Sequence, residues 1–179
     1  NSRVVAVSNS KPQADFINSK CAERNLPNVT AITEDMNHFS IDRRFDRVVS
    51  VEMFEHMRNW PLLLQNISRW LKPAGKLFIH IFCHRKYAYT YDDDGDDNWM
   101  GKYFFSGGVM PSYKLLFYFQ HHLMVERHWH VNGMHYSKTA EAWLKNLDHN
   151  RKQILPIMQD VYGPKDAERW LQRWRIFFM

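Results

Sequence analysis

Short apolar runs alternate with amphipathic stretches over the first 82 residues of the chain. Runs with the length and β-branched content of buried strands lie at residues 3–7, 28–33, 46–51 and 76–82. Apolar positions at helical spacing predict helices over residues 11–24 and 60–71. Strands that alternate with helices are expected to run parallel and to be joined by right-handed crossovers. The pattern therefore predicts an α/β protein with a doubly wound sheet.

The pattern changes after residue 83. Residues 84–110 form an aromatic, glycine-containing insert that is too long for an ordinary connection, so we expect a lid over a site. We then expect a helix, a strand, a long amphipathic helix and a basic last helix, at residues 111–122, 124–131, 137–158 and from 165 onward. Because the chain opens in a strand pattern and stops in a helical one, we expect a single domain over residues 1–179, truncated at both ends.

Composition narrows the class of protein. With 179 residues, 45% hydrophobic content and no apolar window long enough to cross a bilayer, the chain is expected to be one globular, cytoplasmic domain. Its formal charge of +5 is scattered, which does not favour a nucleic-acid partner. Basic and bulky apolar residues mix in the last helix, which suits a peripheral contact with an anionic membrane surface. Cys21 and Cys83 lack metal-ligand spacing and are expected to be reduced thiols.

The strongest chemical signal follows the third predicted strand. Glu52, Glu55 and His56 come directly after Val51, and one helical turn there would put all three side chains on one face. Ligands of open α/β sheets bind beyond the carboxyl ends of the strands, so this cluster is a candidate active site. It does not match the inverted zinc signature, in which a histidine stands where Glu52 does, and we expect no metal. The acidic run at residues 92–97 does not fit a calcium loop and is expected to be a solvated lid tip.

Polar residues also follow the first two strands. All seven glycines lie at or after Gly75, so no glycine-rich turn precedes the first helix, and a dinucleotide dehydrogenase is disfavoured. Hydroxyl and amide groups follow the first strand, on Ser8, Asn9, Ser10 and Gln13. These groups suit a ribose or an amino-acid moiety, or they form a plain helix cap. After the second strand, Asp35 can accept a hydrogen bond from an adenine amino group while Met36 packs on the ring, or Asp35 is an ordinary turn residue.

Several ordered motifs together resemble one enzyme family. They are Ser8-Asn9-Ser10 with Gln13, Asp35-Met36, residues 50–57, residues 104–112, and His135-Tyr136 with Thr139. This set resembles the cyclopropane-fatty-acid-synthase-like S-adenosylmethionine-dependent methyltransferases, and within them the coclaurine N-methyltransferase type. The resemblance implies a class I methyltransferase (Rossmann-like) fold, with the first strand and glycine-rich turn expected before Asn1 and the last strands after Met179.

The resemblance also implies which residues hold the cofactor S-adenosyl-L-methionine. Ser8, Asn9, Ser10 and Gln13 would line its ribose and methionine side, Asp35 and Met36 its adenine, and Val51 the floor near the sulfonium.

The proton-handling groups favour methylation of a small hydrophobic or aromatic amine. An amine attacks only when it is unprotonated, so we assign Glu55 and His56 to the base role and Glu52 to holding the cationic amine, although these roles can be exchanged. The alternative in the same family is cyclopropane-fatty-acyl-phospholipid synthesis with a bound bicarbonate, for which the resemblance implies Glu55, His84 and Tyr136. A carboxylate at Glu52 disfavours that apolar lipid substrate. A catalytically silent binding or membrane-associated module is the third hypothesis.

Overall fold

The computed structural model describes residues 2–92 and 98–179. The chain divides into two compact units, Asn1–Val125 and Glu126–Met179, and each is described by itself. The first unit contains the strands and the candidate site, and the second is helical. Cys21 and Cys83 are both free thiols.

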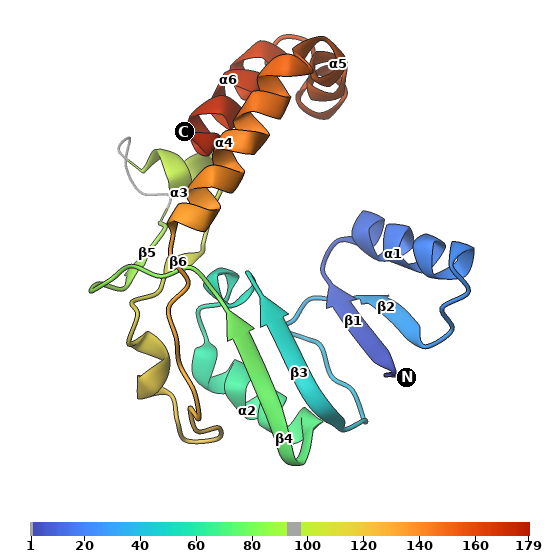
Figure 1. Ribbon diagram of the computed structural model, residues 1–179, viewed down its shortest axis with the longest axis vertical. Coiled ribbons are helices and arrows are strands. Elements are labelled where there is room, and N and C mark those ends of the chain that lie inside the picture. The colour runs from blue at the N-terminus through green and yellow to red at the C-terminus, as the bar shows by residue number, and fades with distance from the viewer. Residues whose placement is uncertain (1, 93–97) are drawn as a thin grey trace. The chain divides into compact units, whose positions relative to one another are not determined.

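The first unit begins with a parallel strand pair. β1 (Val4–Ser8) pairs with β2 (Val29–Thr33), and α1 (Lys11–Glu23) connects them and packs on one face of the pair (Figure 1). The helix begins where the sequence predicts, because Ser10 caps it and a proline stands in its first turn.

A second parallel pair carries the core of this unit. β3 (Phe45–Val51) pairs with β4 (Leu71–His80), and α2 (Trp60–Trp70) connects them. The arrowheads of β1, β3 and β4 point toward the same end of the unit (Figure 1). The buried core cluster comes from the turn after β3, from α2 and from the start of β4, and consists of Phe54, Trp60, Leu63, Leu64, Ile67, Trp70 and Leu71. The apolar face of α2 thus fixes the position of β3 and of the turn that follows it.

The predicted lid has little regular structure. Its ends meet in an antiparallel pair, β5 (Tyr89–Thr90) with β6 (Val109–Met110), and a short helix, α3 (Trp99–Tyr103), lies between them. Residues 93–97, which include most of the acidic run expected at the lid tip, lie outside the described residues. A 3-10 turn, η2 (Leu115–Tyr118), follows and packs against the core cluster through Leu115 and Leu116.

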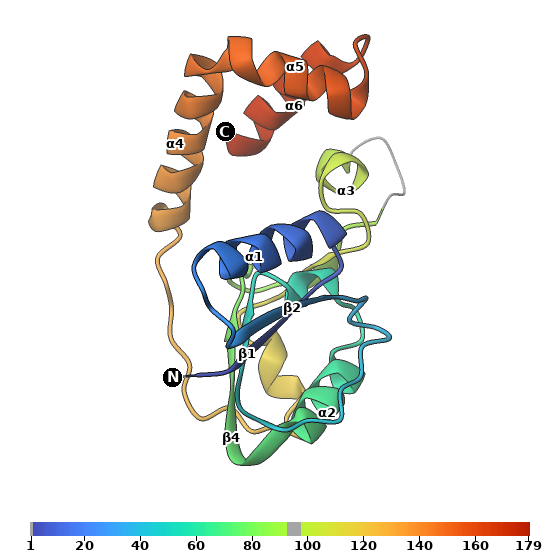
Figure 2. The ribbon, with the colours of Figure 1, turned by 90° about the vertical axis from the view of Figure 1, so that its right-hand side faces the viewer.

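The second unit consists of three helices, α4 (Met134–His149), α5 (Arg151–Tyr162) and α6 (Ala167–Phe178). Helices α5 and α6 run side by side (Figure 2). Leu147, Ala167 and Leu171 are buried between the helices. In the parts of the chain that the structure describes, no helix combines the length and the apolar character needed to cross a membrane.

The structure confirms a mixed α/β fold and corrects several elements. Among the described residues the strands form three two-stranded sheets. The strand predicted at residues 124–131 is wrong, because this segment forms no regular secondary structure. The helix predicted at residues 111–122 is reduced to the single turn η2. The long helix predicted at residues 137–158 is two helices, which meet at Asn150.

Candidate active site

The site is built where β3 ends beside β4. In the parallel register Val51 lies opposite His80, and the next residue, Glu52, donates its backbone N–H to the His80 carbonyl at 2.9 Å. Glu52 has a φ of 49°, a left-handed conformation that side-chain-bearing residues seldom adopt. Its carboxylate also meets the imidazole of His80, with 2.9 Å between Oε1 and Nδ1. Two contacts from one residue therefore hold Glu52 at the end of the sheet.

Glu55 lies inside the protein, in contrast to Glu52. Its side chain is 1% exposed, and its Oε2 has no hydrogen-bond partner among the described residues. Burial is the main reason why the pKa of Glu55 rises from 4.5 to about 7; the negative charge of Glu52 and a hydrogen bond with Glu52 add to this, while a backbone hydrogen bond opposes it. A carboxyl group with this pKa exchanges a proton readily near neutral pH.

The turn that carries Glu55 is anchored to the core. Phe54, Glu55 and His56 form the 3-10 turn η1 (Phe54–His56). The indole N–H of Trp60 donates to the carbonyls of Phe54 and Met57, at 3.0 and 2.9 Å, and its ring packs edge-on against Phe54. Because Trp60 and Phe54 are both buried, this contact anchors the turn to the core of the unit.

The prediction that Glu52, Glu55 and His56 share one helical face is wrong in its geometry. The α-helix begins only at Trp60, and Glu52 lies outside η1 in a left-handed conformation. Glu55 is consequently buried while Glu52 and His56 are exposed. The two carboxyl groups still interact with each other, whereas His56 belongs to a different set of contacts.

His56 lies against aromatic residues of the lid. Its ring stacks on Phe105 with 4.7 Å between centroids, and Phe105 also contacts Phe82 and Tyr91. Burial, and secondarily the neighbouring Tyr89, raises the pKa of Tyr91 to about 12, so this phenol stays neutral. The apolar rings cover one face of the His56 imidazole, while the side chain stays exposed to solvent.

Gly108 allows the lid to approach the backbone of Glu55 closely. A Cβ atom at this position would lie 2.5 Å from Cδ1 of Phe105 and 3.1 Å from the carbonyl oxygen of Glu55. Arg58 adds a second connection between the turn and the lid, since it donates to the Gly107 carbonyl at 2.8 Å and to Asp92 at 2.7 Å. The lid is thus held against η1 by packing and by hydrogen bonds.

The two residues predicted for a bicarbonate site have different surroundings. Nδ1 of His84 accepts hydrogen bonds from the backbone N–H groups of Lys86 and Tyr87, at 3.1 and 2.7 Å, so a proton on its ring resides on Nε2. Tyr136 lies in α4 of the second unit, is 60% exposed and packs edge-on against Trp143.

The residues predicted to bind ribose and methionine form a polar group at the carboxyl end of β1. The Ser8 hydroxyl donates to Gln13 Oε1 at 2.9 Å and accepts from the backbone N–H of Ser10 at 3.1 Å. Ser10 also caps α1 by accepting from the Gln13 N–H, and Asn9 is exposed in the turn. These hydroxyl and amide groups therefore combine the helix-cap role with an exposed polar surface.

Asp35 and Met36 are placed by local contacts after β2. Oδ1 of Asp35 accepts from the backbone and side-chain N–H groups of Asn37, at 2.8 and 2.9 Å, which is a turn-forming role. Its Oδ2 lies 3.9 Å from His38 and remains half exposed. Met36 packs against the core cluster. Asp35 thus has one oxygen engaged in the turn and the other facing outward.

His80, Arg58 and Phe82 take part in this site although sequence reasoning did not select them. His80 and Phe82 both lie within the strand predicted over residues 76–82. The rule that led to Glu52, that ligand-binding groups follow the carboxyl ends of parallel strands, applies equally to His80 at the end of β4. The strand as predicted runs on to residue 82, so the rule reaches His80 only once the observed end of β4 is known.

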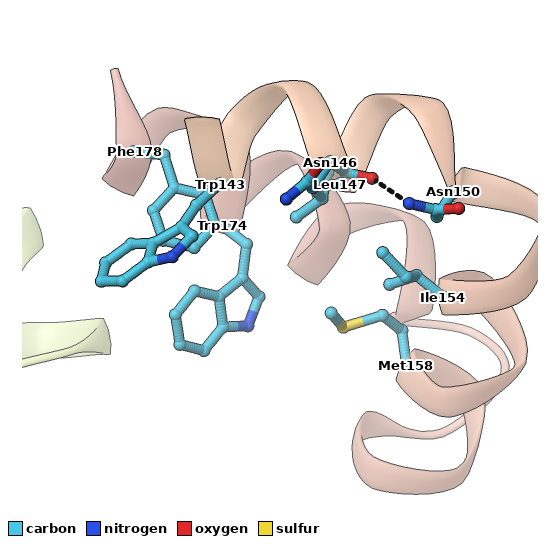
Figure 3. A pocket seen from close by; sticks show the side chains of 8 residues that line it. All are labelled: Trp143, Asn146, Leu147, Asn150, Ile154, Met158, Trp174 and Phe178. Carbon is cyan, nitrogen blue, oxygen red and sulfur yellow. Dashed lines mark hydrogen bonds between the residues drawn. The ribbon is translucent and has the colours of Figure 1, made fainter. Parts of the chain in front are cut away.

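An apolar hollow of about 330 Å³ lies within the second unit, among its three helices (Figure 3). It is lined by Trp143, Asn146, Leu147, Asn150, Ile154, Met158, Trp174 and Phe178. None of the predicted catalytic or cofactor-binding residues lines it.

Comparison with known proteins identifies the family. The mixed α/β fold matches the solved structure of a coclaurine N-methyltransferase bound to N-methylheliamine and S-adenosylhomocysteine, with a TM-score of 0.90, 38% identity and coverage of 98% of this chain and 52% of that one. The chain belongs to the mycolic acid cyclopropane synthetase family, which it matches over residues 1–172.

Two curated relatives illustrate the range of activities in this family. The (S)-coclaurine N-methyltransferase of Thalictrum flavum subsp. glaucum is 39% identical over 181 residues, with coverage of 99% of this chain and 50% of the relative. The cyclopropane-fatty-acyl-phospholipid synthase of Escherichia coli K12 is 31% identical over 188 residues, with coverage of 98% and 47%. The chain thus spans about half the length of the curated relatives it matches.

Proposed function

We propose that the protein transfers a methyl group from S-adenosylmethionine to the nitrogen of a small hydrophobic or aromatic amine. The observation that carries this proposal is the pair of unequal carboxyl groups after β3: Glu55 is buried with a pKa of about 7, and Glu52 beside it is half exposed. Similarity to N-methyltransferases over nearly the whole chain supports an amine as the acceptor.

Glu52 is the residue that binds the cationic amine. Its carboxylate is partly accessible to solvent and stands at the edge of the sheet, where a protonated amine can reach it. A carboxylate forms a charge-assisted hydrogen bond with an ammonium group but must lose its hydration to contact an apolar acyl chain. Glu52 therefore selects for an amine over a lipid alkene.

Glu55 is the residue that removes the proton from the bound amine. The N–H bond breaks, its electron pair stays on nitrogen, and the proton goes to the carboxylate of Glu55, whose pKa of about 7 leaves it ionised for much of the time at neutral pH. A base positioned in this way typically accelerates a reaction by roughly 10²- to 10⁴-fold. His56, stacked on Phe105, is the second candidate for this role and also excludes water from one side of the turn.

The polar group after β1 and the residues after β2 fit an adenosyl cofactor. The hydroxyl and amide groups of Ser8, Ser10 and Gln13 match a ribose or an amino-acid moiety, with Asn9 exposed beside them. The outward Oδ2 of Asp35 is suited to accept a hydrogen bond from an adenine amino group, next to Met36. When bound, S-adenosylmethionine supplies an electrophilic methyl group, and the apolar, exposed side chain of Val51 is the surface we assign beneath it.

We further infer that the two parallel pairs, β1–β2 and β3–β4, belong to one doubly wound sheet of the class I methyltransferase type. Both pairs are parallel, and each has its connecting helix on one face. A structure of the full-length protein in which the two pairs are not part of the same sheet would contradict this inference.

Cyclopropane formation on a phospholipid is the alternative, and His84 favours it. Because its Nδ1 is occupied by two backbone donors, its Nε2–H is available to an anion such as bicarbonate. Glu55 would hold the same anion in its protonated form. The carboxylate of Glu52 beside this position is the observation against a lipid substrate.

The function is tested by incubating the full-length protein with methyl-labelled S-adenosylmethionine and a mixed pool of benzylisoquinoline-type amines and phospholipids. We expect label on the amine nitrogen. A matched variant, Glu52→Gly, suits the left-handed backbone at this position and removes the whole side chain, carboxylate included. Loss of a charged hydrogen bond is expected to lower kcat/KM for the amine by roughly 10- to 100-fold.

Unchanged amine turnover in Glu52→Gly would contradict the role of Glu52, and label found only in cyclopropane rings would replace the proposal with the lipid alternative. Calorimetry with S-adenosylhomocysteine distinguishes the two enzymatic hypotheses, N-methylation and cyclopropane formation, from a catalytically silent module. Heat of binding is expected, and its absence in the full-length protein would favour the silent module.

A further inference from the structure

The side chain of His80 lies where β4 ends and points to the carboxylate of Glu52. The 2.9 Å between Nδ1 and Oε1 brings the imidazole into direct polar contact with the carboxylate. The two side chains are similarly accessible, at 45 and 41%. This pair belongs to the edge of the sheet rather than to the buried core.

Glu52 depends on contacts with its neighbours to hold its position. It lies between β3 and η1, outside both, and its left-handed backbone is a conformation that persists only where the surroundings enforce it. Glu55 repels it when both carboxyl groups are ionised. In the absence of a partner, a half-exposed carboxylate in this position rotates toward bulk water, away from the like charge.

His80 contacts Glu52 in two ways. Its backbone carbonyl accepts the Glu52 N–H, which fixes the main chain, and its imidazole holds the carboxylate. The first contact does not depend on the identity of residue 80, because any residue contributes the same carbonyl in this register. The second contact depends on the imidazole alone, so the two functions can be separated by substitution.

We propose that His80 is a positioning residue that holds the Glu52 carboxylate next to Glu55 and thereby sets the affinity of the site for a cationic amine. This inference rests on the proposed function, which it deepens. The contact with the imidazole holds the Glu52 carboxylate beside Glu55, at the edge of the sheet where an amine can reach it. Glu52 then binds the ammonium group, and Glu55, once it is ionised, removes the proton.

Substitution of His80 in the full-length protein tests this role. In His80→Ala the carboxylate loses the side-chain contact that positions it, and we expect KM for a benzylisoquinoline-type amine to rise by roughly tenfold, the size typical of losing one polar contact to a charged group. Affinity for S-adenosylhomocysteine and the melting temperature are expected to stay unchanged, because the backbone contact of residue 80 remains. His149→Ala, at the exposed end of α4, is the matched control and is expected to leave KM unchanged.

Two further variants distinguish positioning from a general structural effect. His80→Asn places an amide N–H at the position of Nδ1, and we expect it to restore KM to within about threefold of the wild type. In a Glu52→Gln background, His80→Ala is expected to have no additional effect, because the group that it positions has been neutralised.

The outcomes separate this proposal from the function on which it rests. A wild-type protein that methylates no amine refutes the proposed function, and with it this role of His80, before any variant is compared. Amine turnover with an unchanged KM in His80→Ala overturns the His80 proposal alone. An effect of His80→Ala that is equally large in the Glu52→Gln background also overturns it, since His80 would then act independently of Glu52.

Discussion

Replacing Glu55 with glutamine is expected to stabilise the folded protein above neutral pH. Below about pH 4.5 the carboxyl group is protonated in both the folded and the unfolded chain, so glutamine and glutamic acid behave alike. Between pH 4.5 and about 7 the unfolded chain loses this proton while the folded protein keeps it. Because the folded state binds more protons in this window, the stability of the wild type falls as the pH rises.

The size of the effect follows from the pKa of Glu55 in the two states. The difference between 4.5 and about 7, at roughly 1.36 kcal/mol for each pKa unit, amounts to about 3 kcal/mol of lost stability once the pH exceeds 7. Glu55→Gln removes the ionisable group but keeps its size and a hydrogen-bonding end. The variant is therefore expected to gain about 3 kcal/mol relative to the wild type at high pH and less than about 1 kcal/mol near pH 5.

Urea unfolding followed by circular dichroism at about pH 5 and about pH 8.5 measures this difference. Glu34→Gln, at an exposed position after β2, is the matched control and is expected to show the same stability difference from the wild type at both pH values. If Glu55→Gln is no more stabilising at the higher pH than at the lower, Glu55 is not a buried carboxyl group with a raised pKa, and the reasoning about its proton chemistry fails.

Three further predictions follow from the same contacts. The kcat/KM for an amine should rise with pH through about 7 as Glu55 becomes ionised, and a profile that stays flat across this range would exclude it as the base. Gly108→Ala should destabilise the protein by about 1–3 kcal/mol and lower activity, because the new methyl group collides with Phe105. The control is Gly133→Ala, where no other atom lies within 4 Å of the added Cβ. Equal effects of the two substitutions would refute the close approach of Gly108 to Phe105. Trp60→Phe should cost about 1–3 kcal/mol in urea unfolding, since two carbonyls lose their donor; full stability would show that the indole does not anchor the turn.

The strands and helices of the first unit are largely predictable from the sequence. Runs of β-branched residues in β1 and β3 and the apolar stripe of α2 arise from local periodicity, which does not require knowledge of distant contacts. The segment at residues 124–131 shows the limit of this approach. Its apolar and aromatic side chains fit a strand, but it forms no regular secondary structure, because strand formation depends on the whole fold.

The position of the site was predictable, but its internal geometry was not. That proton-handling groups gather after β3 follows from the strand-end rule. Which of them is buried depends on the left-handed φ of Glu52, which contacts His80, and on the 3-10 form of η1, which Trp60 anchors. Helical spacing places the three side chains on one face, whereas the actual turn buries Glu55 and puts the Glu52 carboxylate next to the imidazole of His80.

The pairing of the two carboxyl groups is the central claim, and NMR titration of the Glu55 carboxyl carbon in the full-length protein tests it most directly. We predict a pKa of about 7 in the wild type. In Glu52→Gln we predict a value between 4.5 and 7, because burial remains while the neighbouring negative charge is gone. A Glu55 pKa that is the same in Glu52→Gln as in the wild type, or an ordinary value of 4.5 in both proteins, would contradict the account.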